Sequence, residues 1–213
     1  MAGGQLRLVL ATTNRGKVAE LRRLLVAALD PFLAVRLEFI GLEAVGGGPV
    51  REDGANYEEN ARRKLAVVPP APGRAVLADD SGIEVDALDG APGIHSARWA
   101  RGPAGESLDG PGLNAELLRR LAGVAAPARG ARMVCAVALR FPDGHVAIGS
   151  GEVRGLIASD QSGGGGFGYD RVFLLPDGRR LSEQPSAVKD ALGHRGNAVR
   201  AVAPALAAWL AGR

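Results

Sequence analysis

Two neighbouring carboxylates, Asp79 and Asp80, follow a short apolar run and precede Ser81. Adjacent carboxylates repel each other, and a metal ion or another cationic partner makes such a pair tolerable. Mg²⁺ suits this pattern, because it takes oxygen ligands, keeps several waters and bridges substrate phosphates. A capped turn is the alternative, because Asp and Ser are common turn residues. We favour metal or base chemistry, which Glu52 and Asp53 in the preceding loop can complete.

A polar turn joins the first predicted strand to the first predicted helix, and it consists of Thr12, Thr13, Asn14, Arg15, Gly16 and Lys17. Free N–H groups at a helix N-terminus bind anions, and a lysine there adds a point charge. The turn is not a Walker A loop, which needs Gly in place of Ala11 and Ser or Thr in place of Val18. Thr13 or Asn14 can instead cap the helix. Phosphate binding and simple capping both stay open.

Lysine is scarce in this chain. Of the 26 basic residues only Lys17, Lys64 and Lys189 are lysines, which leaves 23 arginines. The abundance of Ala, Gly and Arg indicates a GC-rich coding bias that depletes lysine. The three that persist are therefore poor candidates for generic surface charges.

A glycine-rich segment, Gly163–Gly168, has the spacing of a dinucleotide-binding fingerprint. That fingerprint requires a preceding strand and a following helix, whereas Tyr169-Asp170 and a predicted strand follow here, so we reject it. A loop that lets the backbone approach a ligand is the preferred interpretation, and a plain solvent loop is the alternative. Phe167 can present its ring to a base.

Two further groupings are weak when judged by spacing alone. Asn60 and Lys64 share a helix face, for which a solvated surface is the simpler interpretation. Lys189 and the segment His194-Arg195 place several donors within seven residues, where they can grip a carbonyl-rich or anionic group.

The elements that must position these residues alternate early in the chain and then give way to a hairpin. The apolar pattern predicts strands at Leu6–Ala11, Val35–Ile40, Ala75–Ala78, Ile83–Ala87, Met133–Phe141, His145–Ile157 and Arg171–Leu175. It predicts helices at Lys17–Leu29, Asn56–Val68, Leu113–Ala122 and Gly196–Leu210. Asp79–Gly82 is expected to be a turn at a strand end. The pattern predicts an α/β protein with a mixed sheet in two lobes.

Composition narrows the function classes. The chain of 213 residues is 46% hydrophobic, 23% charged and 4% aromatic, with a net charge of +3 and no long run of one sign. Those values argue against a nucleic-acid surface. The single cysteine excludes an intrachain disulfide. The apolar run at the start is too short for a signal peptide and the C-terminal run is too short to span a bilayer, so we expect a cytoplasmic protein with no membrane partner.

Taken in order, six segments resemble the inosine/xanthosine triphosphate pyrophosphatase family, which removes non-canonical purine nucleotides from the nucleotide pool. The segments are Leu10–Lys17, Glu58–Ala61, Ala78–Val85, Gly90–Arg98, Gly165–Asp170 and Ser186–Gly196. Each is short, but together they span nearly the whole chain. The resemblance implies an elongated two-lobed α/β fold over residues 1–213, with a mixed sheet, a cleft between the lobes and a homodimeric assembly.

The resemblance also implies the reaction and the residues. Family members split ITP, dITP or XTP into the monophosphate and pyrophosphate with Mg²⁺. Asp80 would be the metal-linked proton acceptor, and Glu52 would help to hold the metal. The turn Thr12–Lys17 and Lys64 would contact phosphates. The remaining substrate contacts would be Ser81, Phe167, Gly168, Tyr169, Asp170, Lys189, His194 and Arg195.

Three positions depart from the family pattern: Thr13 replaces a common Gly, Val188 a common Glu and Gly193 a common Ser. The last two bear on base preference more than on the reaction. A pyrophosphatase for other damaged nucleotides, or a nucleotide sensor without turnover, are the competing interpretations. The carboxylates around Asp80 argue against a sensor, which needs no base to activate water.

Overall fold

A computed structural model describes residues 5–48, 50–102 and 104–212. Residues 1–4, which belong to the segment judged too short for a signal peptide, lie outside the described residues. Pro49, Pro103 and Arg213 lie outside them as well. No described helix combines the length and apolarity needed to cross a bilayer.

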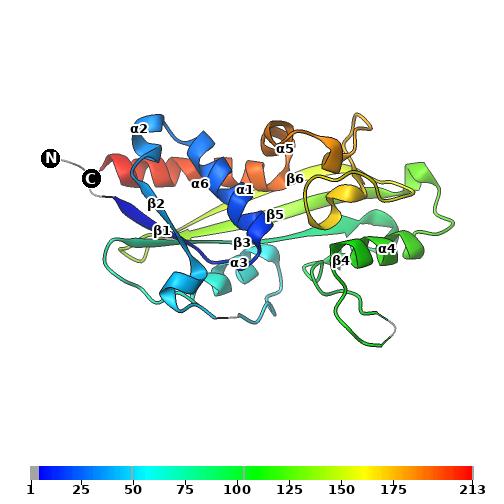
Figure 1. Cartoon of the computed structure of the whole chain (residues 1–213), viewed down its shortest axis with the longest axis horizontal. Coiled ribbons are helices and arrows are strands. Elements are labelled where there is room, and N and C mark those ends of the chain that lie inside the picture. The colour runs from blue at the N-terminus through cyan, green and yellow to red at the C-terminus, as the bar shows by residue number, and fades with distance from the viewer. Residues whose placement is uncertain (1–4, 49, 103, 213) are drawn as a thin grey trace. The chain divides into compact units, whose positions relative to one another are not determined.

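The described chain is a mixed α/β structure (Figure 1). Its strands are β1 (Leu6–Leu10), β2 (Leu37–Gly41), β3 (Arg74–Val85), β4 (Pro92–Gly93), β5 (Gly130–Arg140), β6 (Val146–Ile157) and β7 (Phe173–Leu174). Its α-helices are α1 (Arg15–Ala28), α2 (Pro31–Ala34), α3 (Tyr57–Leu65), α4 (Gly110–Arg120), α5 (Ser186–Leu192) and α6 (His194–Ala211). Short 3₁₀ turns cover Leu42–Val45, Asp86–Leu88, Ala126–Ala128, Gly168–Arg171 and Leu181–Glu183.

The strands follow the order β2-β1-β3-β5-β6-β7, and β4 pairs with β3. β1 is parallel to both β2 and β3, whereas β3–β4 and β6–β7 are antiparallel. The prediction of a mixed sheet is therefore confirmed. Parallel strands need a crossover connection. The segment with α1 connects β1 to β2, and the segment with α3 connects β2 to β3, which lies on the other side of β1.

The chain divides into two compact units. Unit 1 comprises Met1–Asp80, Cys135–Gly151 and His194–Arg213, and unit 2 comprises Ser81–Val134 and Glu152–Gly193. The implied elongated shape and interlobe cleft stay predictions.

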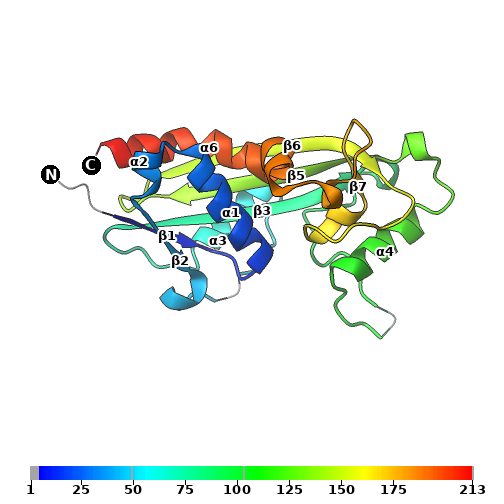
Figure 2. The same ribbon diagram turned by 45° about the horizontal axis from the view of Figure 1, so that its top comes forward.

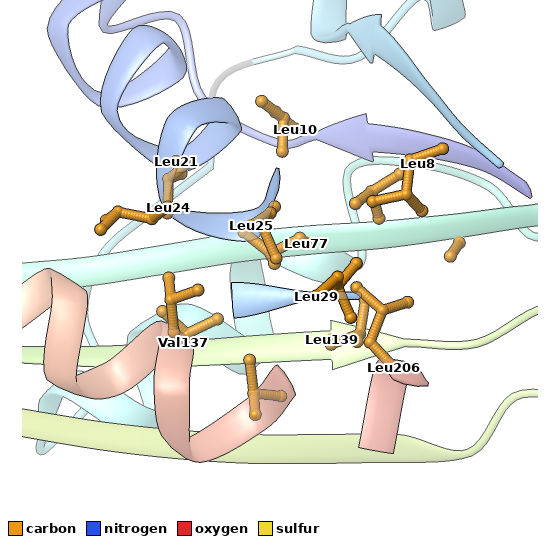
Figure 3. Packing of buried hydrophobic residues seen from close by; sticks show 14 of the residues in the cluster. Leu8, Leu10, Leu21, Leu24, Leu25, Leu29, Leu77, Val137, Leu139 and Leu206 are labelled. Atoms are coloured by element: carbon orange, nitrogen blue, oxygen red, sulfur yellow. The ribbon is translucent and has the colours of Figure 1, made fainter. Parts of the chain in front are cut away.

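Unit 1 is built around a leucine-rich core between its strands and two helices. Alternate side chains of β1 and β3 enter this core, because successive residues of a strand point to opposite faces. Helices α1 and α6 cover that face, and α3 lies on the other face in both views (Figures 1 and 2). Figure 3 shows the core side chains, among them Leu8, Leu10, Leu21, Leu24, Leu25, Leu29, Leu77, Val137, Leu139 and Leu206.

Unit 2 has its own core, in which Leu113 and Leu117 of α4 and Leu121, the C-cap residue of that helix, form an apolar stripe. The spacing of four residues between successive leucines places them on one side of the helix axis. They share the core with buried side chains from β3, β5, β7 and the Gly168–Arg171 turn, namely Ile83, Val85, Met133, Tyr169 and Phe173.

Two predicted boundaries were wrong. Asp79–Gly82 is not a turn but the middle of β3, which runs without a break from Arg74 to Val85. Turn-forming residue types were misleading there, because ladder pairing and burial outweigh the local preference of Asp and Ser. The strand predicted over Arg171–Leu175 shrinks to β7, since the residues before it wind into a 3₁₀ turn.

Candidate active site

The two adjacent carboxylates point to opposite faces of β3. Asp79 shares the α1 and α6 face, because it contacts Lys17 and Arg195, and Asp80 shares the α3 face, because it contacts Asn60 and Lys64. Alternation along a strand produces this separation directly. Cationic partners do accompany the pair, and each carboxylate has its own set of them: Lys17 and Arg195 for Asp79, and Lys64 for Asp80.

Asp80 lies in a compact cluster formed with one face of α3. Its Oδ1 is 2.7 Å from Lys64 Nζ, and its Oδ2 accepts a hydrogen bond of 3.1 Å from Asn60 Nδ2. Lys64 Nζ also lies 2.7 Å from Glu52 Oε1 and donates to the Asp79 carbonyl oxygen at 3.0 Å. One ammonium group thus joins Glu52 to Asp80, the two residues implied as metal ligands.

The helix α3 is fixed at its start so that this face meets β3. The Asn56 side chain caps the helix by accepting from the Glu59 N–H. The Asn60 Oδ1 accepts a 2.8 Å hydrogen bond from the Gly54 N–H, so Asn60 is satisfied on both sides of its amide. Asn60 is fully buried, which makes it a rigid link between the Glu52–Gly54 loop and Asp80.

Lys64 stays protonated throughout the neutral range. Burial lowers the pKa of its ammonium group, but the charges of Asp80 and Asp79 outweigh that effect and hold the pKa above its ordinary value of 10.5. The cluster therefore keeps a fixed positive charge beside Asp80.

On the opposite face, the fully buried Asp79 is the centre of a second cluster. Its Oδ2 lies 3.0 Å from Lys17 Nζ and 3.1 Å from Arg195 Nε, and the Cys135 Sγ is 3.9 Å away. Arg195 continues the network through Nη1, which lies 2.7 Å from Glu20 Oε2. The guanidinium is only 3% exposed, so Arg195 ties β3, α1 and α6 together.

The cations of this cluster keep Asp79 ionised. Burial raises the pKa of the carboxyl, but the charges of Lys17, Arg195 and Lys64 prevail and hold that pKa well below its ordinary value. The Asp79 Oδ1 is buried and has no hydrogen-bond partner within the described parts of the chain. Burial also raises the pKa of the Cys135 thiol to about 12, so this cysteine is an inert core residue at neutral pH.

The turn before α1 is capped by Asn14, whose Oδ1 accepts from the Lys17 N–H at 3.1 Å. Thr12 Oγ1 accepts in turn from the Asn14 N–H at 3.2 Å. Capping, one of the two alternatives raised by the sequence, is therefore confirmed. Thr13, Asn14 and Arg15 are exposed, so the capped end still presents backbone groups to solvent.

In unit 2, the loop Phe167–Asp170 is fastened by its own side chains. Asp170 Oδ2 accepts from the Phe167 N–H at 3.1 Å and forms an ion pair with Lys189. The Tyr169 hydroxyl donates to the Ser96 carbonyl oxygen at 2.7 Å. Gly166 must be glycine, because its φ is +75° and a Cβ would lie 2.1 Å from Asp170 Oδ2.

The structure thus gathers the predicted residues into two groups. The group in unit 1 flanks β3, with Glu52, Lys64 and Asp80 on the α3 face and with Lys17 and Arg195 around Asp79 on the opposite face. In unit 2, Lys189 pairs with Asp170 of the Phe167–Asp170 loop. Ser81 follows Asp80 directly in β3, and His194 is the first residue of α6. Within the described ranges, no group of three or more His, Cys, Asp or Glu side chains is arranged to hold a metal.

Two polar residues that contact these groups are part of no sequence motif: Glu20, which pairs with Arg195, and Asn114, which donates to the Gly168 carbonyl. Both lie on the buried faces of amphipathic helices, Glu20 beside Leu21 in α1 and Asn114 beside Leu113 in α4. A polar side chain on an apolar face was the available signal, because burial of such a group requires a partner.

Comparison with known proteins agrees with the fold and the motifs. The Ham1 family matches residues 8–205. A dITP/XTP pyrophosphatase of Streptomyces coelicolor is 42% identical over 93% of this chain and 96% of its own length. The solved structure of a HAM1 protein from Coxiella burnetii has a TM-score of 0.78 and 31% identity, covering 95% of this chain and 98% of that one. A dITP/XTP pyrophosphatase from Mycobacterium abscessus has a TM-score of 0.65 and 35% identity, covering 96% and 97%. The resemblance inferred from the six segments is confirmed, and this chain belongs to the Ham1 family.

Proposed function

We propose that this protein hydrolyses dITP, ITP and XTP to the nucleoside monophosphate and pyrophosphate. The observation that carries the proposal is the cluster of buried Asp80, Lys64 and Asn60 with partly buried Glu52, which places a base beside a fixed cation. The relatives named dITP/XTP pyrophosphatases support the substrate class. Clearing such nucleotides from the pool is the corresponding cellular role, in the cytoplasm and as a homodimer.

Two lysines are suited to the triphosphate, which carries about four negative charges at neutral pH. Lys64 extends from α3 with its ammonium group beside Asp80, and Lys17 lies in the first turn of α1. The exposed turn Thr12–Lys17 adds the positive end of a helix dipole. Together these groups provide positioning and charge neutralisation, on which phosphoryl transfer chiefly depends.

The donor set around Lys64 fits Mg²⁺. Glu52 Oε1 and Asp80 Oδ1 both approach one ammonium nitrogen at 2.7 Å, so two carboxylate oxygens already converge on a single cation. Mg²⁺ is usually held by one or two carboxylates together with substrate phosphates and waters. Glu52 and Asp80 would hold it, and when bound it would lower the pKa of water and neutralise phosphate charge.

Asp80 is the proposed general base. Asn60 holds its Oδ2 and Lys64 its Oδ1, which fixes the plane of the carboxylate. In this arrangement Asp80 accepts a proton from the water that attacks the α-phosphate, and the bridging oxygen leaves with pyrophosphate. For the base and sugar end we propose Ser81, Phe167–Asp170, Lys189 and His194 as contacts. Phe167 stacks on any purine, and a Lys189 donor favours a 6-oxo group over an amino group.

The direct test measures pyrophosphate released from dITP, ITP, XTP, GTP and ATP, with and without Mg²⁺. Phosphate detection should give a signal only when an inorganic pyrophosphatase is added. Asp80→Asn, which keeps the size of the side chain, should lower kcat roughly 10²–10⁴-fold, the usual contribution of general base catalysis. Orthophosphate release without the helper enzyme would contradict the proposed bond cleavage. Tight dITP binding without any turnover would support the sensor interpretation instead.

A further inference from the structure

Asn114 is a fully buried amide on the apolar face of α4, and neither the motifs nor the comparisons give it a role. Asparagine is a poor residue for a helix interior, because it loses side-chain freedom and competes for backbone hydrogen bonds. Its neighbours on that face are Leu113 and Leu117, which belong to the core of unit 2. A polar group at such a place requires a reason beyond packing.

The partner of Asn114 lies 54 residues away, in the loop Phe167–Asp170. The Asn114 Nδ2 donates a 3.1 Å hydrogen bond to the carbonyl oxygen of Gly168. Gly168 has a φ of +59°, a left-handed conformation that favours glycine and sets the direction of this carbonyl. The start of α4 lies close to the same residue, since a Cβ on Gly110 would be 3.7 Å from the Gly168 nitrogen.

Three buried side chains therefore hold this four-residue loop. Asn114 holds its second residue, the Tyr169 hydroxyl reaches the Ser96 carbonyl, and Asp170 binds the Phe167 N–H and Lys189. Phe167 is the loop residue whose side chain takes no part in these hydrogen bonds and is only partly buried. The Asn114 Oδ1 is buried and lacks a hydrogen-bond partner within the described ranges, so the amide is retained for its donor.

We propose that Asn114 is a positioning residue that fixes the Phe167–Asp170 loop in the orientation needed to receive a purine base. The proposal rests on the proposed function for the identity of the ligand, whereas the fixing of the loop stands on the contacts alone. Gly168 is the first residue of the short 3₁₀ turn Gly168–Arg171, so loss of the Asn114 donor removes the contact that ties its carbonyl to α4.

The test uses Asn114→Asp, which keeps the shape but sets an acceptor against the Gly168 carbonyl, and Asn114→Ala as a second variant. Leu121→Val is the matched control, because Leu121 is equally buried and lies seven residues further on, at the C-cap of α4. Amide hydrogen exchange of residues 165–171 reports the loop, and steady-state kinetics with dITP reports its use. Both Asn114 variants should accelerate loop exchange and raise KM for dITP roughly tenfold, with a smaller change in kcat.

A double-mutant cycle with Phe167→Ala separates positioning from general destabilisation. If Asn114 acts through the loop, Phe167→Ala should raise KM far less in the Asn114→Asp background than in the wild type. Loop exchange no faster than in Leu121→Val, or additive effects on KM, would overturn the proposal. If the wild type releases no pyrophosphate from dITP, the proposed function fails, while the exchange measurement still decides whether Asn114 holds the loop.

Discussion

At the residue scale, the site depends on the two directions in which consecutive residues of β3 point. Asp80 faces α3 and the reactive cluster, and Asp79 faces a buried network with Lys17 and Arg195. Asp79 contacts the side chains of Lys17, Arg195 and Cys135 and is fully buried, so it is suited to holding cations in place and not to exchanging protons with substrate. Adjacent carboxylates can thus differ completely in role, because the backbone separates their environments.

Lys64 should not tolerate arginine. Its compact ammonium group meets three oxygens, from Glu52, Asp80 and the Asp79 carbonyl, within 3.0 Å. A planar guanidinium needs more room and a different arrangement of acceptors. Lys64→Arg should lower kcat/KM for dITP by roughly 10²-fold, within the range of a displaced catalytic group. Arg62→Lys, which changes an exposed residue of the same helix, is the control; equal activity in both variants would show that the shape of Lys64 is unimportant.

The free energy of unfolding at acidic pH should depend on Asp79. Its folded pKa lies below the ordinary value of 3.8, so its contribution is present above that value and is lost as pH falls through the folded pKa. Asp79→Asn should be less stable at pH 7 by roughly 3 kcal/mol, because two buried cations lose their partner. That difference should narrow as pH falls below about 4, as measured by urea denaturation from pH 2.5 to 7. A gap that stays constant over this range would mean that Asp79 has no perturbed titration.

At the element scale, α3 and the loop before it act together. The helix is capped by Asn56, and its second turn carries Asn60 and Lys64 toward β3. The loop reaches the same place because the Gly54 N–H binds the Asn60 side chain. Glu52 is thereby brought to Lys64, although twelve residues separate them.

Gly54→Ala should disturb this element without unfolding the protein. A Cβ at Gly54 would lie 2.7 Å from Asn60 Oδ1 and 3.1 Å from the Asn60 backbone nitrogen, so the loop has to move away. Activity on dITP should fall roughly tenfold, since the loop also carries Glu52 and a small displacement of a site residue is costly. Gly48→Ala is the control, because a Cβ there has nothing within 4 Å. Equal kcat/KM values for the two variants would exclude the Gly54 contact from catalysis.

At the scale of the whole molecule, two cores stabilise two units, and each unit holds one group of predicted site residues. Unit 1 carries the residues proposed for phosphate binding and base catalysis around Asp80, and unit 2 carries the Phe167–Asp170 loop with Lys189. Arg195 lies in unit 1 with Asp79 and Glu20, although the family resemblance implies that it contacts substrate. Its two carboxylate partners and low exposure favour a structural role in unit 1, and we propose that role for it.

Arg195→Ala and Lys189→Ala should therefore behave differently. Arg195→Ala leaves Asp79 and Glu20 buried without their cation, so it should cost roughly 3–5 kcal/mol of stability and lower activity on every substrate. Lys189→Ala removes the cation of buried Asp170, but that carboxylate keeps the Phe167 N–H, so the variant should lower Tm less than Arg195→Ala does and should lower the ratio of kcat/KM for ITP to that for ATP. Thermal denaturation and kinetics with both nucleotides check this pair. A normal Tm with a collapsed ITP/ATP ratio in Arg195→Ala would make Arg195 a base-contacting residue.

The sequence by itself determined the family, the mixed α/β fold and the short list of reactive residues. Six motifs in family order indicated the family, and the scarcity of lysine pointed to the functional lysines. The spacing of apolar residues predicted β1, α1, α3, β5 and β6. Only the tertiary structure decided which residues meet. Asp79–Gly82 is a strand and not a turn, because pairing and burial of β3 override local preference, and that strand sends two adjacent carboxylates to opposite faces. The partners Glu20 for Arg195 and Gly168 for Asn114 lie 175 and 54 residues away, so no local pattern could identify them.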